Sequence, residues 1–266
     1  MGAFLSLTGA GASGAAGGGA TGTAVDLALN LESGTNGSAL TVADLNAATL
    51  KSAAAAGTWD FPASATAPTI STTSNFDPTP RKLKVGGTTQ NEGTRNVLHT
   101  TASPDQKRFR YILTTDAAQV SIGFGLFFTN EGTFNFYNWG ELTGNDGKYN
   151  ALHHRDNSPS QVGVEDFSSS IGGLITMGSG QWYWMTMLYD LTNHVIKLRV
   201  YNPSSSWAQV GSESSLAVAG YSTNCKSFML GRTDAHGVFG AATMRTDCVG
   251  VCLSTGVGAT FPLLPT

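Results

Sequence analysis

Residues 180–202 limit the possible folds of this chain more than any other stretch. Between residues 182 and 189, large side chains occupy odd and even positions alike, so a strand here must be covered on both faces. Between residues 195 and 202, apolar side chains alternate with Lys and Arg, the pattern of a strand with one solvated face. Residues 190–193, Asp-Leu-Thr-Asn, supply turn-forming side chains. The stretch therefore predicts an antiparallel hairpin at the centre of a β-sandwich.

Shorter alternating runs predict that strands make up most of the remaining chain. The runs at 118–128 and 133–139 flank a Thr-Asn-Glu-Gly turn and predict a second hairpin. One short helix is expected from about residue 42, because Thr41 and Asp44 have the spacing of a capping box. Further strands are expected at 24–34, 81–87, 94–101, 107–115, 148–155, 207–218, 226–232 and 243–253.

Composition favours one folded domain with few charges. Of the 266 residues, 41% are hydrophobic and only 12% are charged, against a usual share of about 25%. We find no boundary within 24–266 and assign that range to one sandwich, with its apolar last residues docked on the surface. The net charge of −3 and the lack of a basic run argue against a nucleic-acid partner. No apolar run reaches the ~18 residues that indicate a membrane span.

Residues 1–23 precede this sandwich as a segment rich in Gly and Ala. Apart from Met1, its only large apolar side chains are Phe4, Leu5 and Leu7. Such a segment loses more conformational entropy on ordering than it recovers alone. We interpret it as an extended arm that these three residues anchor on a neighbouring subunit, of the same or another type. A flexible tail is the alternative.

The N-terminus and the cysteines both favour folding in a reducing compartment. No Lys or Arg precedes the first apolar residues, as one would in a secretion signal. Cys248 and Cys252 are four positions apart on one expected strand, about 13 Å, which is too far for a disulfide. Buried free thiols are expected, and a bridge between Cys225 and Cys248 stays open. We expect cytoplasmic folding followed by residence in a virion or another extracellular assembly.

Two blocks of the sequence resemble a known family. The hairpin GQWYWMTMLYD…IKLRVYN is similar to the Gly-x-Trp hairpin of laminin-G-like domains. Residues 228–254, FMLGRTDAHGVFGAATMRTDCVGVCLS, are similar to the closing pattern of those domains. The resemblance implies an all-β fold of the concanavalin A-like lectin/glucanase superfamily, an antiparallel jelly-roll β-sandwich. That fold occurs in lectins, glycosidases, adhesion modules and virus proteins, so it does not select a function.

Catalytic residues of the related glucanases are missing from the sequence. In those enzymes a Glu-x-Asp-x-Glu strand places two carboxyl groups on one face, because alternate residues of a strand share a face. This chain has no such motif, and its closest acidic pair, Glu165 and Asp166, is adjacent and points to opposite faces. We expect a protein without enzymatic activity; a glycoside hydrolase or lyase of another kind is the alternative.

The region 135–156 is the best binding candidate. Aromatic rings stack on sugars while amides and carboxylates bind their hydroxyl groups. The alternative is that its aromatic residues pack on the sheet. No cofactor is predicted. The segment that begins at Asn145 is interpreted as a plain turn, and a calcium ion held by oxygens of this region is the open alternative. The candidate glycan-binding residues are Tyr137, Asn138, Trp139, Asn145, Asp146, His154, Arg155 and Asp156.

Three functions fit these patterns. The first is a structural module of a large assembly, such as a phage head-decoration or tail component on the virion surface. The second is an extracellular carbohydrate-binding adhesion module, and the two roles can coexist. The third is a glycoside hydrolase or lyase on the same fold.

Overall fold

The computed structural model describes residues 22–61, 67–73, 75–76, 78, 81–90, 93–100, 107–128, 137–144, 149–156, 160–166, 172–217, 225–231 and 243–266. For residues 137–144 and 149–156 it describes the backbone. The three residues expected to anchor the N-terminal arm, Phe4, Leu5 and Leu7, lie outside the described residues. Asn145 and Asp146 of the candidate glycan-binding region lie outside them as well.

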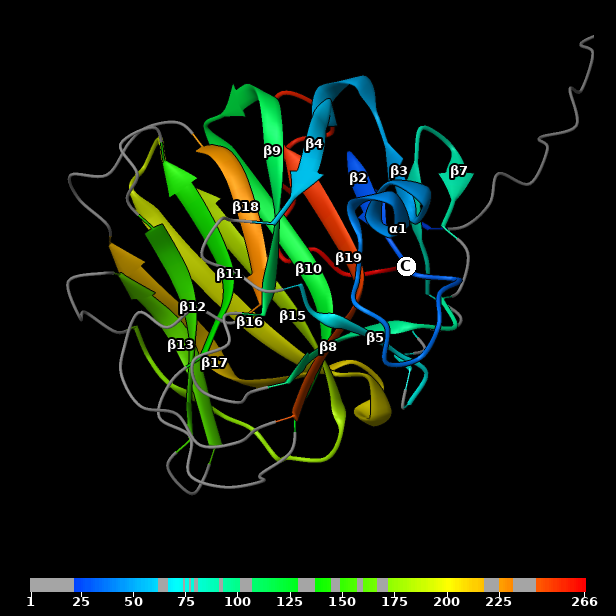
Figure 1. Cartoon of the computed structure of the whole chain (residues 1–266). Helices are drawn as coiled ribbons and strands as arrows, with labels where there is room; N and C mark the ends of the chain where they lie inside the picture. Colours follow the sequence, from blue (N-terminus) through cyan, green and yellow to red (C-terminus); the bar gives the residue numbers. More distant parts are fainter. Residues whose placement is uncertain are drawn as a thin grey trace, which may run out of the picture.

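Strands dominate the described chain (Figure 1). In chain order the elements are β1 (Thr23–Ala24), β2 (Leu27–Leu29), α1 (Val42–Ala47), β3 (Thr49–Lys51), the 3₁₀ turn η1 (Ala53–Ala55), β4 (Gly57–Asp60), β5 (Thr69–Ser71), β6 (Leu83–Val85), β7 (Thr88–Thr89), β8 (Asn96–Thr100), β9 (Arg108–Ala117), β10 (Gln119–Phe128), β11 (Tyr137–Gly144), β12 (Tyr149–Asp156), β13 (Ser160–Asp166), β14 (Ile175–Thr176), β15 (Trp182–Asp190), β16 (Val195–Asn202), η2 (Pro203–Ser205), β17 (Ala208–Ala217), β18 (Cys225–Gly231) and β19 (Thr243–Leu253).

Two large antiparallel sheets form the sandwich. The central sheet has nine strands, in the order β17-β16-β15-β10-β19-β2-β3, with β8 pairing β19 and β5 pairing β8. The outer sheet has seven strands, in the order β14-β13-β12-β11-β18-β9-β4. The all-β antiparallel sandwich expected from the sequence is therefore confirmed. A small third sheet, β1-β6-β7, contains a parallel pair, β1 with β6.

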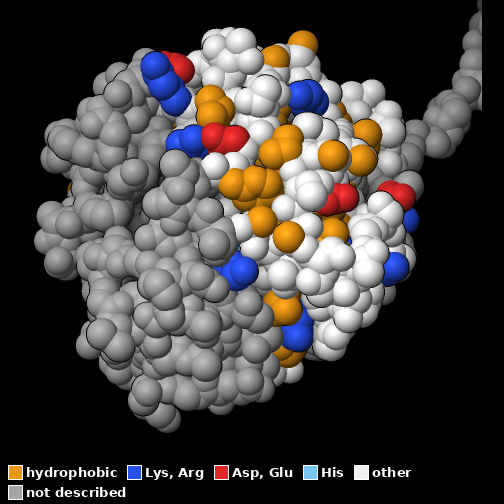
Figure 2. Space-filling view, viewed as in Figure 1, with side chains coloured by type: hydrophobic (Ala, Val, Ile, Leu, Met, Phe, Trp, Pro, Cys, Tyr) orange, Lys and Arg blue, Asp and Glu red, His pale blue; other side chains and the backbone are white. Residues whose placement is uncertain are grey.

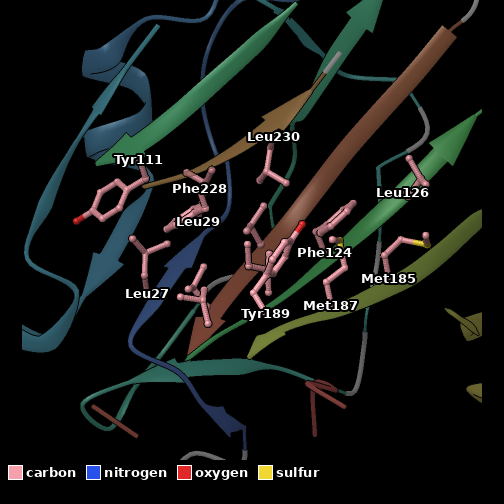
Figure 3. Packing of buried hydrophobic residues seen from close by; sticks show 14 of the residues in the cluster. Leu27, Leu29, Tyr111, Phe124, Leu126, Met185, Met187, Tyr189, Phe228 and Leu230 are labelled. Atoms are coloured by element: carbon pink, nitrogen blue, oxygen red, sulfur yellow. The ribbon is translucent and has the colours of Figure 1, made fainter. Parts of the chain in front are cut away.

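One apolar cluster fills the space between the central and outer sheets (Figure 3). Met185, Met187 and Tyr189 of β15 point into it, as do Phe124 and Leu126 of the neighbouring strand β10. From the outer sheet, Tyr111 of β9 and Phe228 and Leu230 of β18 meet them. Burial of such side chains stabilises the fold by roughly 1.5–3 kcal/mol each.

A second apolar cluster covers the opposite face of the central sheet. It joins Trp184 of β15 and Cys252 of β19 to Leu83 of the small sheet and to Leu263 of the C-terminal tail. The tail is also tied by hydrogen bonds: the Trp184 indole donates to the Leu263 carbonyl at 2.7 Å, and the Leu263 N–H donates to the Thr186 hydroxyl at 2.8 Å. The predicted docking of the last residues is thus confirmed, and the central sheet is covered on both faces.

Glycine residues on the second face of β10 make room for this cover. A Cβ atom at Gly123 would lie 2.5 Å from the Trp184 ring and 3.1 Å from the Leu263 carbonyl oxygen. One at Gly125 would lie 2.7 Å from the ring of Phe76. Because real Cβ atoms do not approach so closely, side chains at either position would push the covering layer away.

The strongest sequence predictions agree with the structure. Trp182–Asp190 and Val195–Asn202 pair as the expected central hairpin. The capping box is present at the start of α1: the Thr41 hydroxyl accepts from the Asp44 N–H, and the Asp44 carboxylate accepts from the Thr41 N–H. All three cysteines are buried free thiols, so Cys225 and Cys248 form no bridge.

Three predictions were wrong in detail. The runs 118–128 and 133–139 do not form a hairpin: β10 pairs with β15 and β19 in the central sheet, while the next strand begins at Tyr137 in the outer sheet. Turn residues predict a reversal of the chain but do not tell which sheet each run joins, and β10 and β11 belong to different sheets. The expected strand 24–34 is reduced to Leu27–Leu29 and a short β1, so Thr23, assigned to the arm, belongs to the small sheet.

The third difference concerns Trp182, the first large residue of the hairpin that the sequence predicts at the centre of the sandwich. It is half-buried, and its ring contacts Phe76 and Phe127 at the border of the second cluster. The fully buried tryptophan is Trp184, two positions along the same face of β15. Period-2 alternation correctly places both rings on one face but does not tell which of them the covering layer reaches.

The described surface carries scattered charges (Figure 2). On the face shown, Lys, Arg, Asp and Glu side chains lie singly or in pairs of opposite sign, without a continuous patch of one sign. Arg110 and Asp60 form an ion pair at 2.6 Å. No helix in the described ranges is long and apolar enough to cross a membrane.

Substitution of Trp184 tests the importance of the covering layer. We expect Trp184→Ala to lower the free energy of unfolding by about 3–5 kcal/mol, because it leaves a cavity and removes the bond to the tail. Trp182→Ala should cost clearly less, since its ring is half-exposed. Urea denaturation of both variants measures the difference, and equal losses would contradict the described cover.

Candidate functional site

The predicted glycan-binding residues lie on two neighbouring strands of the outer sheet. β11 and β12 pair antiparallel, with Tyr137 opposite His154 and Asn138 opposite His153. β12 in turn pairs with β13, where His154 is opposite Val162 and Arg155 is opposite Gln161. The structure thus brings together the two segments that the sequence singled out.

The register divides these residues between the two faces of the sheet. Residues opposite each other on paired strands share a face. Val162 is fully buried in the main cluster, so Tyr137 and His154 occupy positions on the core face. Asn138 and Arg155 are one position away and therefore belong to the outer face. The proposed surface stays a prediction, with Asn138 and Arg155 as its outer-face members.

Trp139 lies at an irregularity in the sheet. Between the pairs Asn138–His153 and Glu141–Ala151, β11 has two residues, Trp139 and Gly140, where β12 has only Leu152. This count is that of a β-bulge, which turns a side chain away from the regular alternation and often occurs beside binding sites. Neither the bulge nor its position could be predicted from the alternating pattern.

A cavity of about 530 Å³ lies in another part of the molecule, beside α1. It is bordered by the segment that follows β2, by α1 and the adjoining β3, and by β7 with the residue after it. In Figure 1 these elements lie on the side opposite β12 and β13. The residues that line it are Asn30, Leu31, Glu32, Ser33, Asp44, Ala47, Ala48, Leu50, Thr88, Thr89 and Gln90.

The cavity has a buried amide floor and an acidic rim. Asn30 and Gln90 are 4% and 7% exposed. The carbonyl oxygen of Ala48, directly after α1, accepts from the Asn30 N–H at 3.1 Å and from Gln90 Nε2 at 3.3 Å. Glu32 is exposed and Asp44 half-buried. Helix capping thus fixes Asp44 at the rim, and the end of the helix fixes Gln90 at the floor.

Two polar atoms at this cavity are buried without a hydrogen-bond partner, Thr89 Oγ1 and Gln90 Oε1. Gln90 Nε2 donates to the carbonyl of Ala48, which can only accept, so this contact assigns the nitrogen and the oxygen of the side-chain amide. Sequence reasoning missed this site. The residues come from three separate short segments, and no motif connects them.

The buried ionisable groups serve the fold. His99 Nδ1 lies 2.8 Å from the Lys107 carbonyl oxygen, which can only accept, so Nδ1 carries the proton. Its Nε2 then accepts from the Thr246 hydroxyl at 2.8 Å. Burial lowers the pKa of His99 to about 4. Burial also raises the pKa of Asp247 to about 8, although its carboxylate accepts from the N–H groups of Phe76 and Cys248.

Among the residues that the structure describes, no three His, Cys, Asp or Glu side chains converge on a point where they could hold a metal ion. The pair Glu165 and Asp166 lies on β13, opposite Ala151 and Asn150. As adjacent strand residues, these two acidic residues belong to opposite faces of the outer sheet.

Comparison with known proteins finds similarity in structure only. No family model matches the chain, and no curated protein matches it in sequence. Among solved structures, the Lotus tetragonolobus seed lectin is 8% identical with a TM-score of 0.40, covering 59% of this chain and 86% of the lectin. Lectin I from Ulex europaeus, solved with the methyl glycoside of α-L-fucose, is 8% identical with a TM-score of 0.39, covering 59% and 85%.

A GH43 protein from Bacillus licheniformis is 11% identical with a TM-score of 0.44. That match covers 61% of this chain but only 33% of the larger protein. At such identities the likeness concerns the sandwich architecture, and nothing about ligands or activity follows from it.

The buried histidine predicts how stability responds to acid. The unfolded chain takes up a proton near the ordinary pKa of 6.5, whereas folded His99 stays neutral down to about pH 4. The contribution of neutral His99 to the free energy of unfolding is therefore complete above pH 6.5, and it is lost as the pH falls from 6.5 towards 4. Urea unfolding over this range should show a smaller pH slope for His99→Gln than for the unmodified protein. An unchanged slope would contradict the assignment.

Proposed function

We propose that this chain is a non-enzymatic structural module of a large protein assembly, a virion surface protein such as a phage head-decoration or tail component. The observation that carries the proposal is the place where residues 1–21 join the fold. They connect to β1 in the small sheet, beside the C-terminal tail: the Thr23 hydroxyl donates to the Thr266 hydroxyl at 3.0 Å, and the Lys82 N–H donates to the Thr266 carbonyl at 3.1 Å.

This attachment point suits a module held at one end. The tail end and α1 lie on one side of the molecule, while β11, β12 and β13 lie on the other (Figure 1). An arm that leaves from the small sheet can bind a neighbouring subunit without covering the far hairpins. Its composition supports the same role, because three large apolar side chains recover less free energy than the ordering of the whole segment costs.

Other features support an assembly role over an enzymatic one. The chain lacks the alternating acidic strand of the related glucanases, and its one adjacent acidic pair is divided between two faces. The three buried thiols agree with folding in a reducing compartment before assembly. The low content of charged residues, 12%, leaves much of the surface neutral and able to enter close protein contacts.

Deletion of residues 2–21 tests the assembly role. The truncated chain should fold with an unchanged melting temperature but should no longer form the higher-order species of the full chain, because it lacks the arm. Sedimentation velocity and electron microscopy of purified material measure the assembly state. A second variant keeps the full length of the arm and removes its apolar anchors: the double variant Phe4→Ser, Leu7→Ser should also fail to assemble. If both variants assemble like the full chain, the arm is a passive tail and the proposal fails.

A second function, glycan binding by the outer face of β11 and β12, is favoured by the bulge at Trp139. An aromatic residue at a bulge directly after Asn138 places a ring that can stack beside an amide that can form hydrogen bonds. This role is compatible with the assembly role, because the two use opposite sides of the molecule.

Glycan binding predicts that Trp139→Ala lowers affinity for a bound oligosaccharide by tenfold or more, since stacking of a ring contributes about 0.5–1.5 kcal/mol beyond the area it buries. A glycan array identifies the ligand, and calorimetry compares the variant with an exposed control away from the outer sheet, Thr255→Ala. Retained affinity in Trp139→Ala would remove β11 from the binding surface. Release of reducing sugar from a bound glycan would instead support the hydrolase alternative.

A further inference from the structure

We propose that the groove under the C-terminal tail is a socket for the tail of a second copy, so that neighbouring copies exchange residues 261–266. This socket consists of the groups on β1, on β15 and just before β6 that hold the segment. The proposal deepens the assembly role and rests on it, because it gives a second contact by which copies are linked. In the structure the chain's own tail occupies the socket, and its contacts show what the socket recognises.

The socket binds the backbone of four consecutive tail residues. The Leu263 carbonyl accepts from the Trp184 indole at 2.7 Å, and the Leu263 N–H donates to the Thr186 hydroxyl at 2.8 Å. The next three carbonyls, those of residues 264–266, also accept hydrogen bonds. Their donors, in the same order, are Thr23 Oγ1, Arg81 Nη1 and the Lys82 N–H. In peptide recognition such main-chain bonds contribute affinity, and pockets for side chains contribute specificity.

Two side chains of the tail provide that specificity. Leu263 is 0% exposed and packs in the second apolar cluster, and Pro265 is buried as well. The backbone of the tail can approach β10 because Gly123 lacks a side chain: a Cβ atom there would lie 3.1 Å from the Leu263 carbonyl oxygen. The socket thus fits a peptide with a large apolar residue two positions before a proline, the pattern of residues 261–266, FPLLPT.

The hinge that leads to the tail permits the exchange. Residues 254–260 are mostly exposed, and seven residues span up to about 25 Å when extended. In the closed form the N–H groups of Gly256 and Gly258 donate to the Leu253 carbonyl, and the Val257 N–H donates to Asp26. Opening the hinge loses these bonds of the turn, whereas every contact within the socket is the same in the closed and the exchanged form. Exchange of an identical element is a low-cost way to link copies for this reason.

The position of the socket connects it to the N-terminal arm. Thr23 belongs to β1, to which residues 1–21 connect, and its hydroxyl donates to the tail. A neighbour that binds the arm is therefore tethered beside the socket, which raises the effective concentration of its tail there. In dilute solution the short hinge favours the chain's own tail, whereas within an assembly the tail of a neighbour competes with it.

A full-length variant with an empty socket tests recognition of a separate tail. In Leu263→Asp the tail no longer fits the apolar cluster, so a fluorescent peptide of residues 259–266 should bind this variant at least tenfold more tightly than the unmodified protein. The peptide that itself carries Leu263→Asp is the matched control and should bind at least tenfold more weakly. Leu263→Ala replaces the variant if Leu263→Asp shows no cooperative melting. Lack of peptide binding, or equal binding of both peptides, would overturn the proposal.

Mixing of full-length chains tests the exchange itself. Unmodified protein and isotope-labelled Leu263→Asp, mixed at a concentration at which the unmodified protein assembles, should form mixed pairs that native mass spectrometry detects. A mixture of labelled and unlabelled Leu263→Asp keeps the arms but has no intact tail, and it should form at least tenfold fewer pairs. Excess peptide of residues 259–266 should also dissolve the mixed pairs of the first mixture.

The outcomes separate this proposal from the assembly role. Equal numbers of pairs in both mixtures would show that the arm alone links the copies, so that tail exchange is wrong while the assembly role stands. Peptide binding without mixed pairs would make the tail a strap of its own chain and would also overturn the exchange. Assembly that persists without residues 2–21 would instead remove the role of the arm and leave the peptide result unchanged.

Discussion

The structure depends on a central sheet whose middle strands are apolar on both faces. In β10 and β15 consecutive residues are buried, so neither strand is stable at the surface of a two-layer sandwich. The outer sheet covers one face. The other is covered by the small sheet, Phe76 and the C-terminal tail, which approach closely because β10 carries Gly123 and Gly125 there. The third layer is thus required by the sequence of the middle strands.

Sequence patterns predicted the strands better than their partners. The central hairpin, the capped helix and the closing strand followed from alternation and capping chemistry, which act within a few residues. The hairpin expected from 118–128 and 133–139 failed because pairing is decided by which sheet has a place for a strand, and a local turn signal carries no information about sheets. Burial of Trp184 rather than Trp182 depended on a tail some eighty positions later in the chain.

The candidate sites show the same contrast between local pattern, which the sequence reveals, and tertiary packing, which it does not. Residues 135–156 could be singled out because they are close in sequence, and the structure pairs the two strands within this range. How their side chains divide between the two faces of the sheet depends on the register of strand pairing, which composition does not reveal. The cavity beside α1 gave no sequence signal, because Asn30, Asp44 and Gln90 meet only when three strands and a helix have packed.

The contact between Thr23 and Thr266 has a mechanical consequence. The two ends of the described chain are held side by side on the small sheet, so a force that pulls them apart acts first on a short parallel strand pair and on the tail. The long antiparallel ladders of the central sheet would bear load only after that layer has detached. The detached length would act as a tether and absorb work while the sandwich stays intact.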